Sequence, residues 1–379
     1  MSDILAPAPN LAASDASRPR FEFTGSGSEY FRIWIVNVLL TIVTLGIYSA
    51  WAKVRRLRYF YNNTRFAGSN FDFHGSPVAI LKGRLIAVLL IALINVPLLG
   101  LVVLLVYFCA LPWLLYRSMR FHLGNTTWRN VRFAFVGDAA GIYKALLVPL
   151  GVVIAAGLAS ALAMWLSPWI GMPMMILTVL AFYALGPYLQ YRLRRYYTDG
   201  ARAGESPFAL HVSVGQYYVV YFVAFAYMIV LGAIASVVVG VTLGMDVRAL
   251  SNPGDFPVGK LVAIAILVAG FYIAMLAIGP LLMAMLQNTV WKGTSLEGQR
   301  FHSDLAVGNF MITWLGLTLA TILTLGLYRP FAAVTLARLR INAMSWTGSA
   351  DDLVAVMRQG TAGATGAEVA DLMDVDISL

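Results

Sequence analysis

Charged residues and cysteine are scarce in this sequence. Acidic and basic residues make up only 12% of the 379 residues, whereas about a quarter of the residues of a soluble domain are charged. The single cysteine excludes a disulfide within the chain. No phosphate loop, no paired carboxylates and no Ser-His-Asp signature can be found, and the four histidines lack metal-ligand spacing. We therefore expect no soluble globular domain, no enzyme, no cofactor and no metal site.

Long apolar runs are what the sequence has instead. Hydrophobic residues make up 60% of it, and a bilayer core needs about 20 apolar helical residues per span. These runs predict an all-α polytopic membrane protein with a transmembrane domain over residues 21–345. A disordered N-terminal tail (1–20) and a mobile C-terminal tail (346–379) would flank it. The apolar segments are expected at 31–50, 81–96, 98–116, 143–166, 172–190, 215–243, 260–286 and 307–328.

The sequence repeats itself around aromatic residues that end apolar runs. In the two complete copies, arginines follow the aromatic residue at +4 and +7, then an Asn-Thr pair, then a Phe-x-Phe-x-Gly string. The first copy has Trp51, Arg55, Arg58, Asn63, Thr64, Phe71, Phe73 and Gly75, and the second has Trp113, Arg117, Arg120, Asn125, Thr126, Phe133, Phe135 and Gly137 at the same offsets. A third copy from Tyr188 keeps Arg192, Arg195 and Phe208, and weaker copies follow Leu281 and Phe331.

Each repeat predicts one local structure. Arginines at +4 and +7 lie on one helical face, so each copy should continue as a short basic helix at the headgroup level. Asn-Thr should end that helix, and the Phe-x-Phe alternation indicates a small β-hairpin in the loop. The fold is thus expected to be repeated transmembrane helical hairpins with basic interfacial helices and β-hairpin-like loops.

Two groups of residues are candidate membrane contacts. Juxtamembrane arginines attract anionic headgroups, although they could equally serve only to set orientation. The candidate headgroup contacts are Arg55, Arg58, Arg117, Arg120, Arg192 and Arg195, and the candidate interfacial anchors are Trp51, Trp113, Phe71, Phe73, Phe133 and Phe135. Asn37 and Asn95, amides inside apolar segments, could line a polar path or join helices by hydrogen bonds.

The distribution of positive charge predicts the topology. The repeated loops carry eighteen Lys and Arg and the alternate connections carry two, so the repeated loops should be cytoplasmic. Segments 31–50 and 307–328 complicate this scheme, because each joins two apparently cytoplasmic elements. Either both cross the membrane and place both termini outside, or each enters and returns; the return is favoured by the basic residues Arg329, Arg338, Arg340 and Arg358.

The string from Thr44 to Thr64, which contains Gly46-Ile47-Tyr48-Ser49-Ala50-Trp51 and is followed by Phe71-Asp72-Phe73-His74-Gly75, resembles the YjgN-like family of bacterial inner-membrane proteins. The resemblance covers about residues 20–345 and implies a multi-pass inner-membrane location. It brings no substrate, cofactor or catalytic residue. The fourth copy departs from the pattern with Met285 and Asn288 at the arginine positions.

Two functions from different classes fit these features. The first is passive transport, export or anionic-lipid handling, with membrane lipids as the partners. The second is a structural or assembly factor that docks an unspecified protein through its loops. No ionisable residue lies deep in a predicted span, which disfavours an ion-coupled pump. The basic residues lie in loops between apolar runs, which argues against nucleic acid as a partner.

Overall fold

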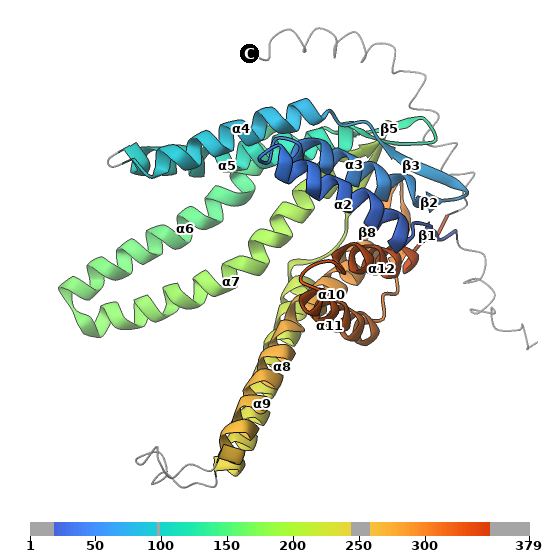
Figure 1. The fold of residues 1–379 in the computed structure, drawn as a ribbon. Helices are drawn as coiled ribbons and strands as arrows, with labels where there is room; N and C mark the ends of the chain where they lie inside the picture. Colours follow the sequence, from blue (N-terminus) through green and yellow to red (C-terminus); the bar gives the residue numbers. More distant parts are fainter. Residues whose placement is uncertain (1–18, 97–98, 244–257, 349–379) are drawn as a thin grey trace, which may run out of the picture.

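A computed structural model of the chain describes residues 19–96, 99–243 and 258–348 (Figure 1). The predicted tails, 1–20 and 346–379, fall almost wholly outside these residues. The helices are α2 (Gly27–Val43), α3 (Ser49–Asn62), α4 (Pro77–Ile94), α5 (Leu99–Gly124), α6 (Ala139–Leu166), α7 (Pro168–Gly200), α8 (Val214–Leu243), α9 (Val258–Leu276), α10 (Ile278–Lys292), α11 (Val307–Leu323) and α12 (Arg329–Asn342). The strands are β1 (Phe21–Phe23), β2 (Thr64–Phe66), β3 (Ser69–Phe73), β4 (Thr126–Trp128), β5 (Val131–Phe135), β6 (Ala201–Ala203), β7 (Ser206–Leu210), β8 (Thr294–Leu296), β9 (Gln299–Ser303) and β10 (Met344–Trp346).

The ten strands form one antiparallel sheet in the order of the sequence, and its two ends meet. Arg20 bridges to Ser345, and the Trp346 amide donates to the Pro19 carbonyl over 3.0 Å. A second set of backbone hydrogen bonds recurs around the sheet. Each joins the residue that follows an odd-numbered strand to the residue that precedes an even-numbered strand. These bonds run from the amides of Thr24, His74, Val136, His211 and Asp304 to the carbonyls of Asn63, Asn125, Gly200, Gly293 and Ala343, at 2.7–3.0 Å.

The expected all-α fold is therefore wrong in one respect. Helices dominate, but the predicted separate hairpins pair edge to edge into a single sheet. The alternation of Phe71 and Phe73 indicates a hairpin, yet it cannot name the neighbouring strand. Phe73 pairs with Thr126, across a whole helical hairpin of intervening chain. The prediction that Asn-Thr ends the helix is confirmed, since Asn63 caps α3 and its side-chain amide donates to the Tyr59 carbonyl over 2.8 Å.

The inside of the closed sheet is filled with aromatic side chains. Five equivalent phenylalanines form a ring in which successive centroids lie 6.1–6.3 Å apart. They are Phe21, Phe71, Phe133, Phe208 and Phe301. The residues opposite them in the register are at most 2% exposed. These are Phe66, Trp128, Ala203, Leu296 and Trp346. The sheet therefore encloses a packed core.

Three of the strand ends carry a glycine because a phenylalanine ring lies on it. A Cβ on Gly75 would lie 2.5 Å from Cε1 of Phe73, and the shortest distances to the corresponding phenylalanine rings are 2.8 Å at Gly25 and 2.7 Å at Gly137. Where the aromatic residue is replaced, as at Leu210, the glycine is replaced too, by Val212. The Phe-x-Gly string is therefore explained by the close packing of the phenylalanine ring on the glycine, where the strand joins the helix.

Among the described residues, six helices are long and apolar enough to cross a membrane. They cover 77–94, 99–124, 139–166, 168–200, 214–238 and 265–292, and the hairpins α4–α5, α6–α7 and α8–α9 extend away from the sheet in Figure 1.

The two segments for which the sequence left crossing or re-entry open, 31–50 and 307–328, both leave the sheet and turn back to it. Between α2 and α3, Leu45 (φ 50°) and Gly46 (φ 92°) adopt left-handed backbone that reverses the chain, and Leu325 and Gly326 repeat these angles. Helix α2 has 17 residues, about 25 Å, which is shorter than a bilayer core of about 30 Å. Leu45 at its tip is 94% exposed, which suits a reversal that lies in lipid.

The packing of Phe73 on Gly75 predicts a non-additive pair of substitutions. Gly75→Ala should destabilise the protein by about 1–3 kcal/mol, because the new methyl group has no room. Adding Phe73→Leu, which imitates Leu210 and Val212, should cost less than the sum of the two single changes. Unfolding midpoints in detergent measure this. Gly83→Ala is the control, since a Cβ there meets nothing within 4 Å; equal effects of the two alanines would refute the packing explanation.

The closed sheet also predicts one-sided labelling. In a Cys109→Ala background, cysteines placed at Asn70, Glu205 and Gln299, which are exposed and lie in or close to the hairpin turns, should all react with an impermeant maleimide from the same side of the membrane. Leu45→Cys, at the reversal, should react slowly from either side. Labelling of the three turn positions from opposite sides would contradict the fold.

Candidate anion-binding pocket

A cavity of about 580 Å³ lies among α2, α3, α4 and α12. Four cationic side chains line it, and within the described residues no acidic side chain does. The cations are Lys53, Arg56, Arg84 and Arg329, and the other walls are Tyr30, Trp34, Asn37, Val38, Thr41, Ile42, Ser49, Ala52, Leu57 and Ala333. Such a lining combines excess positive charge with apolar surface.

The four cations come together through local geometry and through the ring of helices. Lys53 and Arg56 are three residues apart and therefore share one face of α3. Arg84 lies in the second turn of α4, where its guanidinium donates to the Ser49 hydroxyl. Arg329 is the first residue of α12, the helix that packs against α2.

The electrostatics of the cavity favour an anion. Burial, followed by the charges of Arg84 and Arg56, holds the pKa of Lys53 below its ordinary value. Burial also raises the pKa of Tyr59, a buried residue of α3, to about 12. A cluster of like charges raises the free energy of the empty site, and an anion would relieve that repulsion.

Asn37 adds an unsatisfied polar group to the wall. Its side chain is 7% exposed, and its Oδ1 has no hydrogen-bond partner within the described part of the chain. A buried polar atom without a partner costs about 1–3 kcal/mol. The sequence had marked Asn37 as an amide within an apolar segment, and the structure places it on this cavity.

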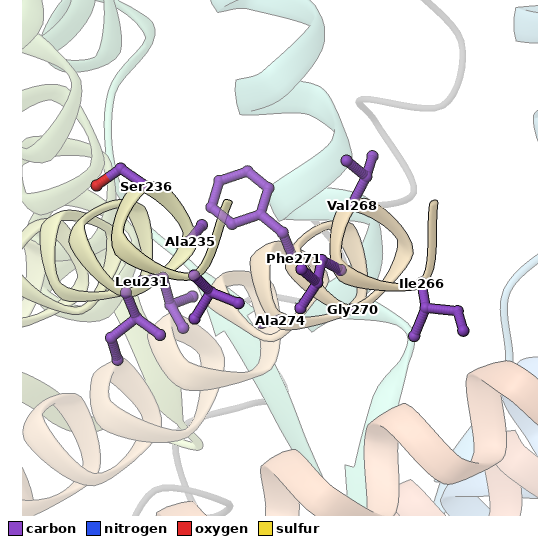
Figure 2. Close-up of a pocket in the computed structure, with 11 residues that line it drawn as sticks. Leu231, Ala235, Ser236, Ile266, Val268, Gly270, Phe271 and Ala274 are labelled. Carbon is purple, nitrogen blue, oxygen red and sulfur yellow. The ribbon is translucent and has the colours of Figure 1, made fainter. Parts of the chain in front are cut away.

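A second cavity, of about 620 Å³, separates α8 from α9 (Figure 2). Its described walls are almost entirely hydrocarbon, and among them the single oxygen-bearing side chain is that of Ser236, whose hydroxyl donates to the Ala233 carbonyl over 2.8 Å. None of these described lining residues can recognise a charged ligand. It is therefore the weaker candidate despite its size.

The predicted headgroup arginines lie elsewhere, and their surroundings divide them into two groups. At the +4 position, the Arg117 guanidinium lies 5.0 Å from the Trp113 ring and that of Arg192 lies 6.0 Å from the Tyr188 ring. Arg55, the equivalent residue in α3, is exposed. These three side chains remain available at the surface, so headgroup contact stays a prediction for them.

The +7 arginines join helix to strand or brace the helix end. Arg58 donates to the Phe73 carbonyl over 3.1 Å, and Arg338 donates to that of Gly25 over 2.7 Å. Arg195 contacts Asp199 and the Tyr191 hydroxyl on its own helix. Arg120 has the equivalent position in α5. The repeated arginine pattern thus has a structural reason at this position.

The predicted aromatic anchors divide in the same way. Phe71, Phe73, Phe133 and Phe135 pack inside the closed sheet or at its junction with the helices, and Phe73 is fully buried. Trp51 is half-buried and Trp113 is exposed. Contact with the bilayer is therefore left to the two tryptophans, for which it stays a prediction.

Sequence reasoning missed most of the pocket because its cations belong to different parts of the repeat pattern. Counting charges assigned Lys53 and Arg84 to one basic loop and Arg329 to the C-terminal end. The structure instead places Arg84 inside α4 and brings it to α3. These residues deviate from the repeat pattern, and that deviation is the sequence signal by which they could have been identified.

Comparison with known proteins confirms the family resemblance. The profile of the family described as "Bacterial protein of unknown function (DUF898)" matches residues 18–372. Inner membrane protein YjgN of Escherichia coli O157:H7 is 33% identical over 135 residues, and that of Salmonella typhimurium is 30% identical over 135 residues. The match spans about a third of this chain and a third of those relatives, at 34% and 33% of their lengths. No solved structure matches the chain significantly.

The charge cluster predicts the reactivity of Lys53. Because Arg84 helps to lower the pKa of Lys53, Arg84→Gln should raise that pKa, leave less neutral amine and slow acylation of Lys53 at fixed mildly alkaline pH. Mass spectrometry after limited acetic anhydride treatment measures the rate. Arg117→Gln, on another repeat, should not change it. An unchanged rate in Arg84→Gln would show that the two charges do not interact.

Proposed function

The chain belongs to the bacterial protein family DUF898, and from this premise we propose that it binds the headgroup of an anionic membrane lipid in the pocket between α2, α3, α4 and α12. The six long apolar helices found in the part of the chain that the structure describes, together with its inner-membrane relatives, support a multi-pass inner-membrane protein. The observation that carries the proposal is the set of four cations on one cavity without an acidic side chain among the described lining residues.

The chemistry of the walls supports a lipid rather than a soluble anion. Trp34, Val38 and Ile42 give the cavity an apolar side along α2, the helix whose tip is suited to lipid. A phosphodiester headgroup would meet the cations while its glycerol and acyl region met that side. Basic residues attract anionic lipid by roughly 1 kcal/mol each, so four could give up to about a thousandfold preference over a zwitterionic lipid.

The proposed orientation places the sheet in the cytoplasm. The excess of Lys and Arg in the repeated loops over the alternate connections supports this side. The pocket would then face the inner leaflet, whose anionic lipids it would meet by lateral diffusion.

Passive transport along the axis of the ring is the less supported part of the functional expectation. A water-filled route would have to pass the five phenylalanines and the buried layer opposite them. Those side chains close the centre of the sheet. Lipid handling requires no such route, because the pocket lies among helices.

An assembly factor that uses its hairpin aromatics as the contact is also less supported. Phe73 and Phe135 are 0% and 6% exposed, so they are unavailable to a partner without unfolding of the sheet. A docked protein would have to use the outer, polar face of the strands.

The lipid proposal predicts a difference between two sets of arginine variants. Purified protein in mixed bilayers should enrich phosphatidylglycerol over phosphatidylcholine, as measured by mass spectrometry of the lipids that remain bound. Arg56→Gln with Arg84→Gln should lower this enrichment about tenfold or more, since roughly 2 kcal/mol of attraction is lost. Arg55→Gln with Arg117→Gln removes the same charge from surface positions.

The surface variants should change the enrichment much less. If they abolish it and the pocket variants do not, the original headgroup arginines are the binding residues and the pocket is not. Inorganic phosphate, added as a competitor at constant ionic strength, separates recognition of a free anion from recognition of a lipid: it should displace little lipid.

A further inference from the structure

The outer face of the closed sheet carries one arginine at each of five equivalent positions. In every described hairpin, including the one formed by the two ends of the sheet, the second cross-strand pair from the turn contains a single arginine. The pairs are Arg65 with Asn70, Thr127 with Arg132, Arg202 with Pro207, Ser295 with Arg300, and Ser345 with Arg20. We call Arg20, Arg65, Arg132, Arg202 and Arg300 the arginine belt.

The belt faces away from the core. Successive side chains of a strand point to opposite faces, and the residues next to the belt, such as Phe66 and Phe133, point inward. All belt arginines but Arg202, which is half-buried, are exposed.

None of the belt arginines makes an ion pair within the described residues; Arg65 donates to the Asn70 side-chain oxygen and Arg202 to the Glu205 carbonyl. Glu22 lies opposite Arg65 in the register without reaching ion-pair distance. Asp72 on the same face and the turn residues Glu205 and Glu297 add further carboxylates, but the belt arginines together with Arg129 outnumber them. The small net excess of positive charge on this face suits an acidic partner.

The membrane is poorly placed to be that partner. The helices leave from one rim of the sheet, and the belt lies by the turns at the other rim. The last part of α5, from Tyr116 to Gly124, and the strand that follows put the belt about 20 Å beyond the apolar run. This exceeds a Debye length of about 8–10 Å at physiological salt.

An acidic segment of the same chain begins beside the belt. The Thr347 amide donates to the Arg300 carbonyl over 3.0 Å, and Trp346 donates to Pro19, next to Arg20. Residues 349–379 follow, with six of the eighteen acidic residues of the chain and one arginine: Asp351, Asp352, Glu368, Asp371, Asp374, Asp376 and Arg358.

We propose that the acidic stretch 368–376 binds the arginine belt. About 20 residues separate it from Gly348, enough to reach any belt arginine, since an extended chain spans about 3.3 Å per residue. The tether also gives an effective concentration in the millimolar range, at which a set of weak surface ion pairs is sufficient. Bound there, the segment crosses the seam where β10 meets β1 and holds the two chain ends together.

The test measures a distance in the full-length protein. In a Cys109→Ala background reconstituted in nanodiscs, spin labels at Ser378→Cys and Gln299→Cys should give one short, narrow distance distribution at low salt that broadens at high salt. Replacing Glu368, Asp371, Asp374 and Asp376 by their amides should broaden it at low salt as well.

Matched variants distinguish the effect of losing belt arginines from the effect of losing positive charge elsewhere on the surface. Arg20→Gln with Arg132→Gln and Arg300→Gln should also broaden the distribution, whereas Arg55→Gln with Arg117→Gln should not. Reversing both sides, with belt arginines changed to Glu and the tail carboxylates to Lys, should restore the narrow peak. A wild-type distribution already broad at low salt, or one insensitive to the belt variants, would overturn the proposal, as would contact of the tail label with lipid. Lipid enrichment is expected to survive the belt variants, so this test does not depend on the pocket.

Discussion

Closure of the short-stranded sheet is the constraint on which the rest of this structure depends. Its strands have three or five residues, and an isolated hairpin of that size is marginal in water. Edge strands find partners only when β10 returns to β1, and the phenylalanine ring is completed at the same point. Since every strand connects to its helix at the same rim, each helical segment must leave and return to that rim. Closure thus makes α2–α3 and α11–α12 reversals rather than single crossings.

The repeat itself could be recognised in the sequence because its spacing is strict, while the closure could not. Arg58 and Phe73 recur at fixed offsets from an aromatic residue, and each has a local structural reason: one joins the helix to the strand, the other packs on Gly75. Pairing between β3 and β4 joins residues separated by a helical hairpin, and no local pattern encodes such a neighbour. Periodicity alone does not identify a lipid contact, because a repeated arginine is as well explained by architecture as by lipid.

The pocket arises where the copies differ. In the offsets counted from the anchor residue, Lys53 corresponds to Leu115, Gln190, Met283 and Ala333, and Arg329 corresponds to Ser49, Leu111, Gly186 and Gly279. The fold forms around these other residues, so it does not require cations at these positions. A cation that the fold does not require lowers the stability of the protein when it lies beside other cations, unless a bound anion compensates the repulsion. Such departures, more than the shared motif, indicate where a repeat protein has acquired a specific task.

The packed centre of the sheet and the position of the pocket among the helices together limit how the protein could act on a lipid. The packed aromatic layers leave no route along the axis, so a headgroup must enter between helices from the plane of the bilayer. There it would meet the cations, and its binding free energy would add directly to the stability of the folded state. With lipid bound as we propose, such a site would couple the lipid composition of the membrane to the stability of the ring. It suits recognition and retention of an anionic lipid better than its passage across the membrane.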